Sequence, residues 1–375
     1  MCRFMIYKGR EPILLAHLLT RPEHSIINQS FDSRLRIDMR RPINGDGFGV
    51  GYYTSETDPE LGDGPCVFCA TTPAWNNVNL ARLAEKTKSS LVFAHVRAST
   101  SGVLSETNCH PFVFHSLMFM HNGQIANFNK LPALKRRFAM HVKDAYLGAI
   151  QGATDSEWAF ALFLDSLDKL GVDPSGPAGL NGFPHTILRE AMEITIRLIK
   201  DWTREAVEAH AVASKQASAD SDDINLNEPS LLNFAVTDGH SVVVTRYITS
   251  RTEEAASLHF STGSRFTAYK PRQYTMERRD RQQDVVLVAS EPLTFERSDW
   301  VTIPTNTIVT INDQTVLLYP IYDEYYNSDP AVARSSGFAA SRGLVSPIVQ
   351  PQAHTNVQLP PLEREGRRRP SLLVA

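Results

Sequence analysis

Hydrophobic and polar residues follow three successive patterns along this chain of 375 residues. Near the N-terminus, short apolar runs are separated by polar or glycine-containing loops, which is typical of strands. In the middle, apolar residues recur three and four positions apart, which predicts helices. Short apolar runs return after residue 231. The predicted strands cover residues 1–7, 91–96, 117–121, 231–236, 241–247, 284–289, 307–311 and 315–318, and the predicted helices cover residues 11–19, 80–88, 131–149, 152–170 and 185–210.

This order of strands, helices and strands again predicts an α+β fold in which two sheets pack face to face with helices outside. The second group of strands has no helices of its own, so we expect it to complete the first group's sheets within one domain, residues 2–325. Residues 213–230 are polar and predicted to be a loop insertion. Residues 326–375 are rich in Ser, Pro and Arg and are predicted to be a disordered tail.

Composition limits the possible functions. Hydrophobic residues make up 42% of the chain, charged residues make up 21%, and the net charge is −3. This balance is typical of a soluble globular protein and argues against a nucleic-acid-binding surface. No apolar stretch is long enough to span a membrane, and the N-terminus lacks the apolar core of a secretory signal. Four cysteines do not suggest a disulfide scaffold, so we predict a cytoplasmic location.

Two local motifs bear on cofactors. Cys66 and Cys69 are spaced like half of a metal site, but they lie in a probable strand, where positions three apart point to opposite faces. Residues 44–53 contain four glycines, which indicates tight turns or close backbone approach, so this loop is expected to pass beneath the site. No helix pattern follows it, so it does not match a phosphate-binding loop. We expect no metal, nucleotide or other cofactor.

Cys2 is the first candidate for chemistry. If Met1 is removed, this residue carries a thiol and a primary amine together. Cysteine thiols and α-amino groups ordinarily titrate near ~8.5 and ~7.7–8.0, so the amine can serve as the base that activates the sulfur as a nucleophile. The alternative is a buried cysteine that packs like any small apolar side chain.

Other polar positions allow a functional and a structural interpretation each. Arg97 follows an apolar strand, where a ligand-binding group or a solvated arginine is equally expected. Asn122 and Gly123 indicate either a hairpin turn or a pair of donors for an oxyanion. Asp155 stands at a helix start, where it either caps the helix or accepts an ammonium group. The polar stretch at residues 21–41 is either a substrate-facing or partner-facing loop or a solvated one.

The order of several short motifs resembles class II glutamine amidotransferase domains, which are N-terminal-nucleophile hydrolases. The resemblance covers residues 2–321 and implies a four-layer αββα sandwich. It also implies Cys2 as nucleophile, Asn122 and Gly123 as the oxyanion hole, and substrate contacts from Arg97, Asp155 and Thr100. The motifs are Met1-Cys2, residues 44–49, His95-Val96-Arg97-Ala98-Ser99-Thr100, Asn108-Cys109-His110-Pro111-Phe112, His121-Asn122-Gly123 and Thr154-Asp155-Ser156-Glu157.

Further segments are similar to the amidotransferase-like subunits of fungal complexes that degrade glutathione. These segments are Arg21-Pro22, residues 25–30, residues 72–77 and residues 289–293. The resemblance implies hydrolysis of the γ-glutamyl amide of glutathione or related γ-glutamyl peptides through a thioester on Cys2. It also implies a metallopeptidase-like partner subunit that handles cysteinylglycine.

One departure from the family pattern affects the choice of reaction. Residues 97–101 read Arg-Ala-Ser-Thr-Ser, where glutamine-dependent synthases often have Arg-Trp-Ala-Thr-His, and no synthase domain is expected after the amidase. A free-standing hydrolase therefore fits better than a donor of channelled ammonia. The alternatives are a glutaminase subunit that feeds ammonia to a separate synthase, and a non-catalytic scaffold that keeps the fold.

Overall fold

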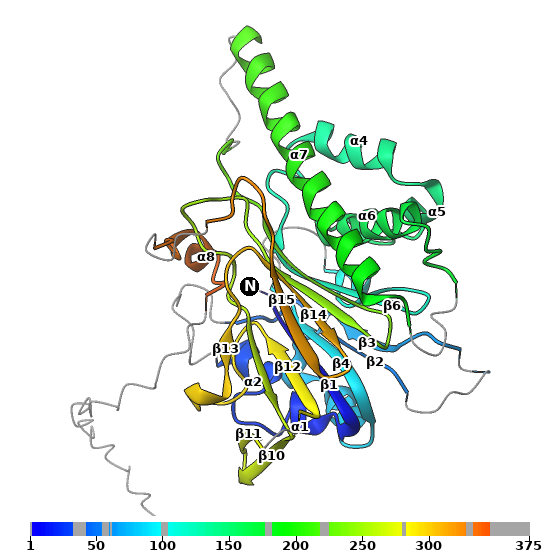
Figure 1. Ribbon diagram of the computed structural model, residues 1–375, viewed down its shortest axis with the longest axis vertical. Coiled ribbons are helices and arrows are strands. Elements are labelled where there is room, and N and C mark those ends of the chain that lie inside the picture. Colours follow the sequence, from blue (N-terminus) through cyan, green and yellow to red (C-terminus); the bar gives the residue numbers. More distant parts are fainter. Residues whose placement is uncertain are drawn as a thin grey trace, which may run out of the picture.

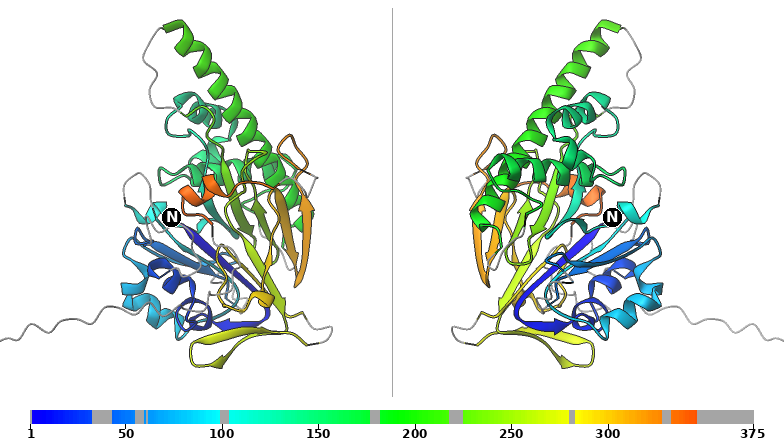
Figure 2. Two further views of the ribbon diagram at one scale, coloured as in Figure 1. Left: turned by 90° about the vertical axis from the view of Figure 1, so that its left-hand side faces the viewer. Right: turned by 90° about the vertical axis from the view of Figure 1, so that its right-hand side faces the viewer.

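Two antiparallel β-sheets lie face to face at the centre of the computed structural model, and helices cover their outer faces (Figures 1 and 2). The structure describes residues 2–32, 43–54, 60, 62–98, 104–176, 182–217, 225–279, 283–327 and 333–345. Within these residues one sheet has seven strands and the other has six. The four-layer αββα prediction is confirmed.

The seven-stranded sheet has the order β13-β9-β12-β1-β4-β2-β3 within the described residues, where its neighbouring strands pair antiparallel. A separate hairpin, β10 (Arg265–Lys270) with β11 (Gln273–Glu277), extends from its end. The strands of the sheet are β1 (Arg3–Leu14), β2 (Phe48–Tyr52), β3 (Cys66–Ala70), β4 (Lys88–Val96), β9 (His259–Gly263), β12 (Val285–Ala289) and β13 (Val301–Thr302).

The six-stranded sheet has the order β15-β14-β8-β7-β6-β5 within the described part of the chain. The pairing of β6 with β7 brings residues 118–124 against residues 231–237. The strands are β5 (Phe112–Phe114), β6 (Leu117–Gln124), β7 (Leu231–Thr237), β8 (Val242–Arg246), β14 (Thr307–Asn312) and β15 (Thr315–Pro320).

The helices are divided between the two outer faces. Those near the N-terminus cover the seven-stranded sheet, those of the middle region cover the other sheet, and α7 extends beyond the sheets at the top of Figure 1. Among the described residues, no helix is both long and apolar enough to cross a membrane. The helices are α1 (Ala16–Leu19), α2 (Ile26–Phe31), α3 (Val78–Ala84), α4 (Pro132–His141), α5 (Asp144–Leu147), α6 (Asp155–Lys169), α7 (His185–Ala217) and α8 (Gly337–Ser341), with short 3₁₀ turns η1 (Ala74–Asn76), η2 (Glu106–Asn108) and η3 (Arg297–Asp299).

Strand β1 shows how the sequence pattern produces the layers. Phe4 and Ile6 pack in the apolar core between the two sheets, whereas Met5 and Tyr7 pack in the core beneath α1, α2 and α3. Successive side chains of a strand point to opposite faces, so a strand that is apolar at every position must be covered on both sides. The continuous apolar start of the chain therefore specifies a central strand.

Several predicted elements differ from the structure. The polar stretch at residues 21–41, predicted as a loop, contains the helix α2, and its residues 33–41 lie outside the described residues. Residues 11–19 were predicted as a helix, but β1 continues to Leu14 because Ile13 and Leu14 pair with Ser89 and Lys88 after a register shift. The predicted helix 131–149 is divided into α4 and α5. The predicted insertion 213–230 begins inside α7, which ends at Ala217.

The C-terminal segment, residues 333–345, is folded, which corrects the predicted tail over these positions. Its α8 region packs Ala339, Leu344 and Val345 into a small apolar cluster that includes Leu231 and Ile248. This folded segment is hard to predict from sequence, because it is short and its apolar residues contact partners more than eighty positions away. Residues 346–375 lie outside the described residues.

Arg334 anchors this segment and provides a test of its attachment. Its guanidinium donates to the backbone oxygens of Ser250 (2.6 Å), Glu253 (3.0 Å) and Tyr325 (2.6 Å). Charge-assisted bonds of this kind contribute roughly 1.5–3 kcal/mol each when protected from water. We expect Arg334→Ala to speed amide hydrogen exchange in residues 333–345 roughly 10- to 100-fold, measured by mass spectrometry.

The control for this experiment is Arg251→Ala. Arg251 is exposed and donates to the backbone oxygen of Glu324, outside the C-terminal segment. Unchanged exchange in Arg334→Ala, or an equal change in both variants, would contradict the anchoring role of Arg334.

Candidate active site

Cys2 lies immediately before β1, the strand that is paired on both sides. Arg3 pairs with Val96 of β4, and Met5 pairs with Ala289 of β12, so the two neighbouring strands fix the direction of the chain start. The Cys2 Sγ is 3.8 Å from the backbone oxygen of Ala98. The N-terminus lies near the middle of the molecule, where the ends of both sheets approach α8 (Figure 1).

A buried charge cluster fixes the residue that follows Cys2. The Arg3 Nε is 2.8 Å from one carboxylate oxygen of Glu291, and the His24 Nε2 is 3.0 Å from the other. These side chains are at most 2% exposed. Arg3 Nη1 also donates to the backbone oxygen of Cys2 over 3.3 Å. Breaking a buried pair of this kind leaves a charge without compensation, so the cluster tolerates little displacement of the chain start.

Asn122 and Gly123 belong to β6, which continues to Gln124 and pairs with β7. The hairpin interpretation is therefore wrong. The Asn122 side-chain amide donates to the Ser290 Oγ over 3.0 Å, which links the two sheets. A Cβ atom added to Gly123 would lie 1.9 Å from the backbone oxygen of Leu231, so only glycine fits here.

Arg97 follows the last residue of β4 and is 5% exposed, so it is not a solvated arginine. Its backbone N–H donates to the Gly47 oxygen (2.8 Å), and its backbone oxygen accepts from Asp46 (3.1 Å). The glycine-rich loop thus runs beside Arg97. A Cβ atom on Gly49 would lie 2.0 Å from the His110 oxygen, which confirms the predicted close backbone approach.

Asp155 is the first residue of α6, and the helix is capped by Thr154, whose hydroxyl accepts from the Glu157 N–H over 3.3 Å. Capping therefore does not account for Asp155. Its carboxylate instead accepts from the backbone N–H of Ile125 over 2.6 Å, which ties the start of α6 to the end of β6. The helix N-terminus additionally favours a negative charge at this position.

One cleft of about 660 Å³ brings these side chains together. Cys2, Arg97, Asn122, Gly123 and Asp155 all line it, although they come from four separate segments of the chain. The remaining predicted site residue, Thr100, lies outside the described residues. A cleft of this volume has room for a small peptide as well as for an amino acid.

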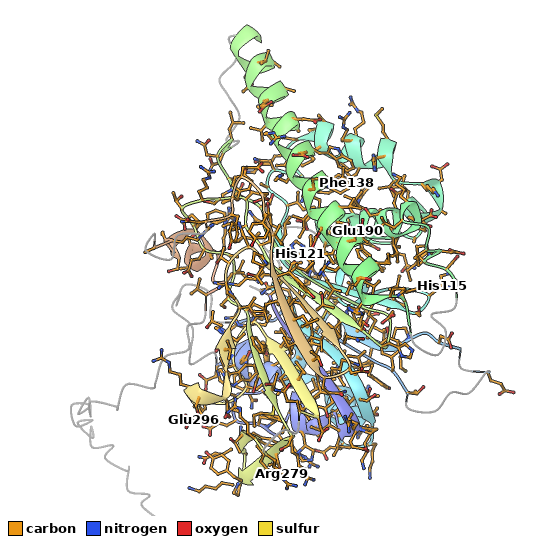
Figure 3. The ribbon with its side chains drawn as sticks, in the orientation of Figure 1. His115, His121, Phe138, Glu190, Arg279 and Glu296 are labelled. Carbon is orange, nitrogen blue, oxygen red and sulfur yellow. The ribbon has the colours of Figure 1, made fainter. Side chains whose placement is uncertain are left out.

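Two buried histidines, His110 and His121, line the cleft, and a third, His95, packs against His110. The His121 ring bridges Ser156 Oγ and the Leu231 backbone oxygen, 2.9 Å from each, and lies near the middle of the molecule (Figure 3). The Leu231 contact makes Nε2 the donor, so Nδ1 accepts from Ser156. Burial lowers the pKa of His121, although Asp155 opposes the shift. Since both ring nitrogens are already engaged, His121 holds α6 against β6 and is not placed to activate the thiol.

His95 and His110 form the second part of this group, with ring centroids 4.2 Å apart. Burial, and secondarily the charge of Arg97, lowers the pKa of His95 to about 3. Burial likewise holds the pKa of His110 well below its ordinary value, and the neighbouring His95 adds to the effect. These imidazoles are therefore neutral at pH 7, and the charges that face the cleft come from arginine, lysine and carboxylate groups.

Several residues of this region were not predicted from the sequence. Ser290 accepts from Asn122 and also from the Phe4 N–H over 3.1 Å, and Glu291 neutralises Arg3. Glu228 and Arg342 also line the cleft. Ser290 and Glu291 could have been suspected, because they directly follow the apolar strand 284–289 inside a segment that already carried the family resemblance.

The chain thus combines a four-layer αββα sandwich with a cleft that contains a cysteine immediately before a central strand. Residues 16–194 match the family described as class-II glutamine amidotransferases. Over 377 aligned residues the chain is 62% identical to the "Probable glutamine amidotransferase DUG3" of Saccharomyces cerevisiae, covering 100% of this chain and 99% of that protein. The chain belongs to the class II glutamine amidotransferase family.

Two further similarities agree with this assignment. The chain is 28% identical to the "Gamma-glutamyl-hercynylcysteine sulfoxide hydrolase" of Mycolicibacterium smegmatis over 173 residues, covering 46% of this chain and 66% of that protein. A solved structure titled as the allosteric regulatory enzyme of purine biosynthesis superposes with a TM-score of 0.50 at 13% identity, covering 90% of this chain and 54% of that one. The latter similarity concerns the fold alone.

The neutral histidines predict how stability depends on pH. An unfolded histidine takes up a proton below about pH 6.5, whereas folded His95 does so only near pH 3. Stability is therefore lost as the pH falls below about 6.5, by roughly 1.4 kcal/mol per pH unit for each such histidine. We expect the free energy of unfolding in urea to fall between pH 7 and pH 5.

His95→Gln should reduce the slope of this dependence by about one proton, whatever its effect on absolute stability. His240→Gln is the matched control, because His240 is exposed. A wild-type free energy of unfolding that stays constant from pH 7 to pH 5 would rule out the neutral buried histidines.

Proposed function

We propose that the protein hydrolyses the γ-glutamyl amide bond of glutathione or a related γ-glutamyl peptide, with Cys2 as the nucleophile. The main support is that Cys2, Asn122, Gly123, Arg97 and Asp155 line one cleft. The family includes amidotransferases, and one relative is named as a hydrolase of a γ-glutamyl compound. Both lines of support favour cleavage of a side-chain amide.

The reaction begins when removal of Met1 exposes the α-amine of Cys2. That amine takes the thiol proton, and the sulfur forms a bond to the γ-carbonyl carbon, which moves negative charge onto the carbonyl oxygen. Asn122 and Gly123 donate hydrogen bonds to this oxygen. The oxyanion then collapses, the carbon–nitrogen bond breaks, and the α-ammonium returns its proton to the leaving amine.

The second half of the reaction releases glutamate. A water molecule gives a proton to the Cys2 amine and adds to the thioester carbon. The carbon–sulfur bond then breaks, and the α-ammonium returns the proton to the sulfur. Arg97 and Asp155 bind the α-carboxylate and α-ammonium groups of the γ-glutamyl unit through both steps. These groups are shared by glutamine and glutathione, so Arg97 and Asp155 select the γ-glutamyl end and not the leaving group.

The proposal includes a partner and a location. On the resemblance to fungal glutathione-degrading complexes, the protein works in the cytoplasm with a metallopeptidase-like subunit that takes up cysteinylglycine. Purification of the native complex, followed by identification of its subunits, tests this part directly. Recovery of a synthase in place of a peptidase would favour the ammonia-donor alternative.

Substitution of the cleft residues tests the hydrolytic role. Cys2→Ser should abolish glutamate release from glutathione, because a serine hydroxyl is a far weaker nucleophile at neutral pH. Arg97→Gln and Asp155→Asn should each lower kcat/KM by roughly 10- to 100-fold, the equivalent of one charge-assisted bond. Asp144→Asn, on the exposed start of α5, is the control and should retain wild-type kinetics.

Full glutamate release by Cys2→Ser would refute the nucleophile. Wild-type kcat/KM in Arg97→Gln and Asp155→Asn would refute only the binding roles. A kcat/KM for glutamine well above that for glutathione, which rises on adding a synthase, would replace the peptide hydrolase with a glutaminase subunit.

A further inference from the structure

The C-terminal segment forms part of the wall of the cleft. Arg342 and Leu344 line the same cleft as Cys2, together with Gln124 and Glu228. The segment is fixed near the nucleophile, because Arg3 Nη1 donates to the Gly343 oxygen (3.4 Å) as well as to the Cys2 oxygen. Arg342 is thus separated from the reacting residue by little more than one buried side chain.

Arg342 is held in a defined position. Its Nη2 forms an ion pair with Glu228 Oε1, and the Gln124 side-chain amide donates to the same oxygen over 2.6 Å. The guanidinium also lies over the Phe338 ring, 5.5 Å from its centroid. The Glu228 side chain is 6% exposed, whereas that of Arg342 is 35% exposed. The carboxylate is therefore the buried support and the guanidinium is the accessible group.

A guanidinium carries five N–H donors in a planar fork that matches a carboxylate. The pair with Glu228 uses Nη2, so the other donors of this fixed group can serve a ligand in the cleft. Arg97 and Asp155 are already assigned to the carboxylate and ammonium groups of the γ-glutamyl unit. Arg342 is a further cation in the same cleft, so it is available to a charged group on the leaving side of the substrate.

We propose that Arg342 binds the terminal carboxylate of the leaving group and so selects γ-glutamyl peptides over glutamine. This inference rests on the proposed function, because it assigns the part of the cleft that hydrolysis of a peptide requires. Glu228, Gln124 and Phe338 act as positioning residues for the guanidinium. Glutamine, whose leaving group is ammonia, makes no such contact and loses the corresponding affinity.

The test measures binding of two peptides to the full chain carrying Cys2→Ala, which leaves the substrate intact. The peptides are glutathione and glutathione with its glycine carboxylate converted to an amide. By titration calorimetry, we expect the amide to bind about 10-fold more weakly, the factor for one charge-assisted bond. With Arg342→Gln added, the two peptides should bind equally.

Lys130→Gln is the matched control, because Lys130 is another cation that lines the cleft. It should preserve the 10-fold difference between the two peptides. Arg342→Lys should retain part of the difference, because it keeps the charge without the planar fork. If Arg342 had a purely structural role, its substitution would weaken the binding of both peptides equally and leave the ratio of their affinities unchanged.

The outcomes separate this inference from the proposed function. A 10-fold difference that persists in Arg342→Gln, or disappears in Lys130→Gln, overturns the role of Arg342 while peptide hydrolysis stands. Absence of binding by either peptide, together with absence of glutathione hydrolysis by the wild-type chain in its native complex, overturns the proposed function and this inference with it.

Discussion

The position of the chain start is the constraint on which the rest of the site depends. Because β1 is paired with β4 on one side and β12 on the other, the backbone of residues 3–8 has little freedom to move. The buried contact between Arg3 and Glu291 then fixes the end of that strand. A nucleophile that uses its own α-amine as the base must be the first residue of the chain. The chain therefore holds it on one side only, and the strand that follows must be fixed in place to position it.

The second sheet supplies the complementary half of the site. Asn122 and Gly123 approach from β6, and Ser290 links Asn122 to the backbone of Phe4. The apolar core between the two sheets keeps the separation between the two halves of the site constant, because close-packed interiors resist small displacements. The helix α6 completes the cleft through Asp155, which is tied to β6 by the Ile125 N–H. Each half of the cleft is therefore positioned by regular structure.

Much of the fold could be predicted because its central strands and long helices are strongly patterned. The runs at residues 91–96 and 231–236 are apolar throughout, as strands covered on both faces must be. Strands β9, β10, β11 and β13 were missed, because their half-exposed sequences resemble loops. The helix predicted at residues 11–19 is correct only from Ala16 onward, because pairing with β4 outweighed the local pattern in its first half.

The candidate site was predicted in part for a related reason. Cys2, Arg97, Asn122 and Asp155 stand in short motifs or at the ends of recognisable elements. Ser290 contacts Asn122 across 168 positions of sequence, and Arg342 contacts Glu228 across 114, so no local pattern marks either contact. The folded C-terminal segment was assigned to a tail because its few apolar residues are matched only by distant partners.

The central claim is that processing exposes Cys2 and that its sulfur then carries the γ-glutamyl group. Intact-protein mass spectrometry before and after reaction with an electrophilic γ-glutamyl analogue tests this claim most directly. The account predicts a mature chain without Met1 and a single label, located on Cys2 by peptide sequencing. A chain that keeps Met1, or a blocked N-terminus, while hydrolysing γ-glutamyl substrate at its normal rate would contradict it.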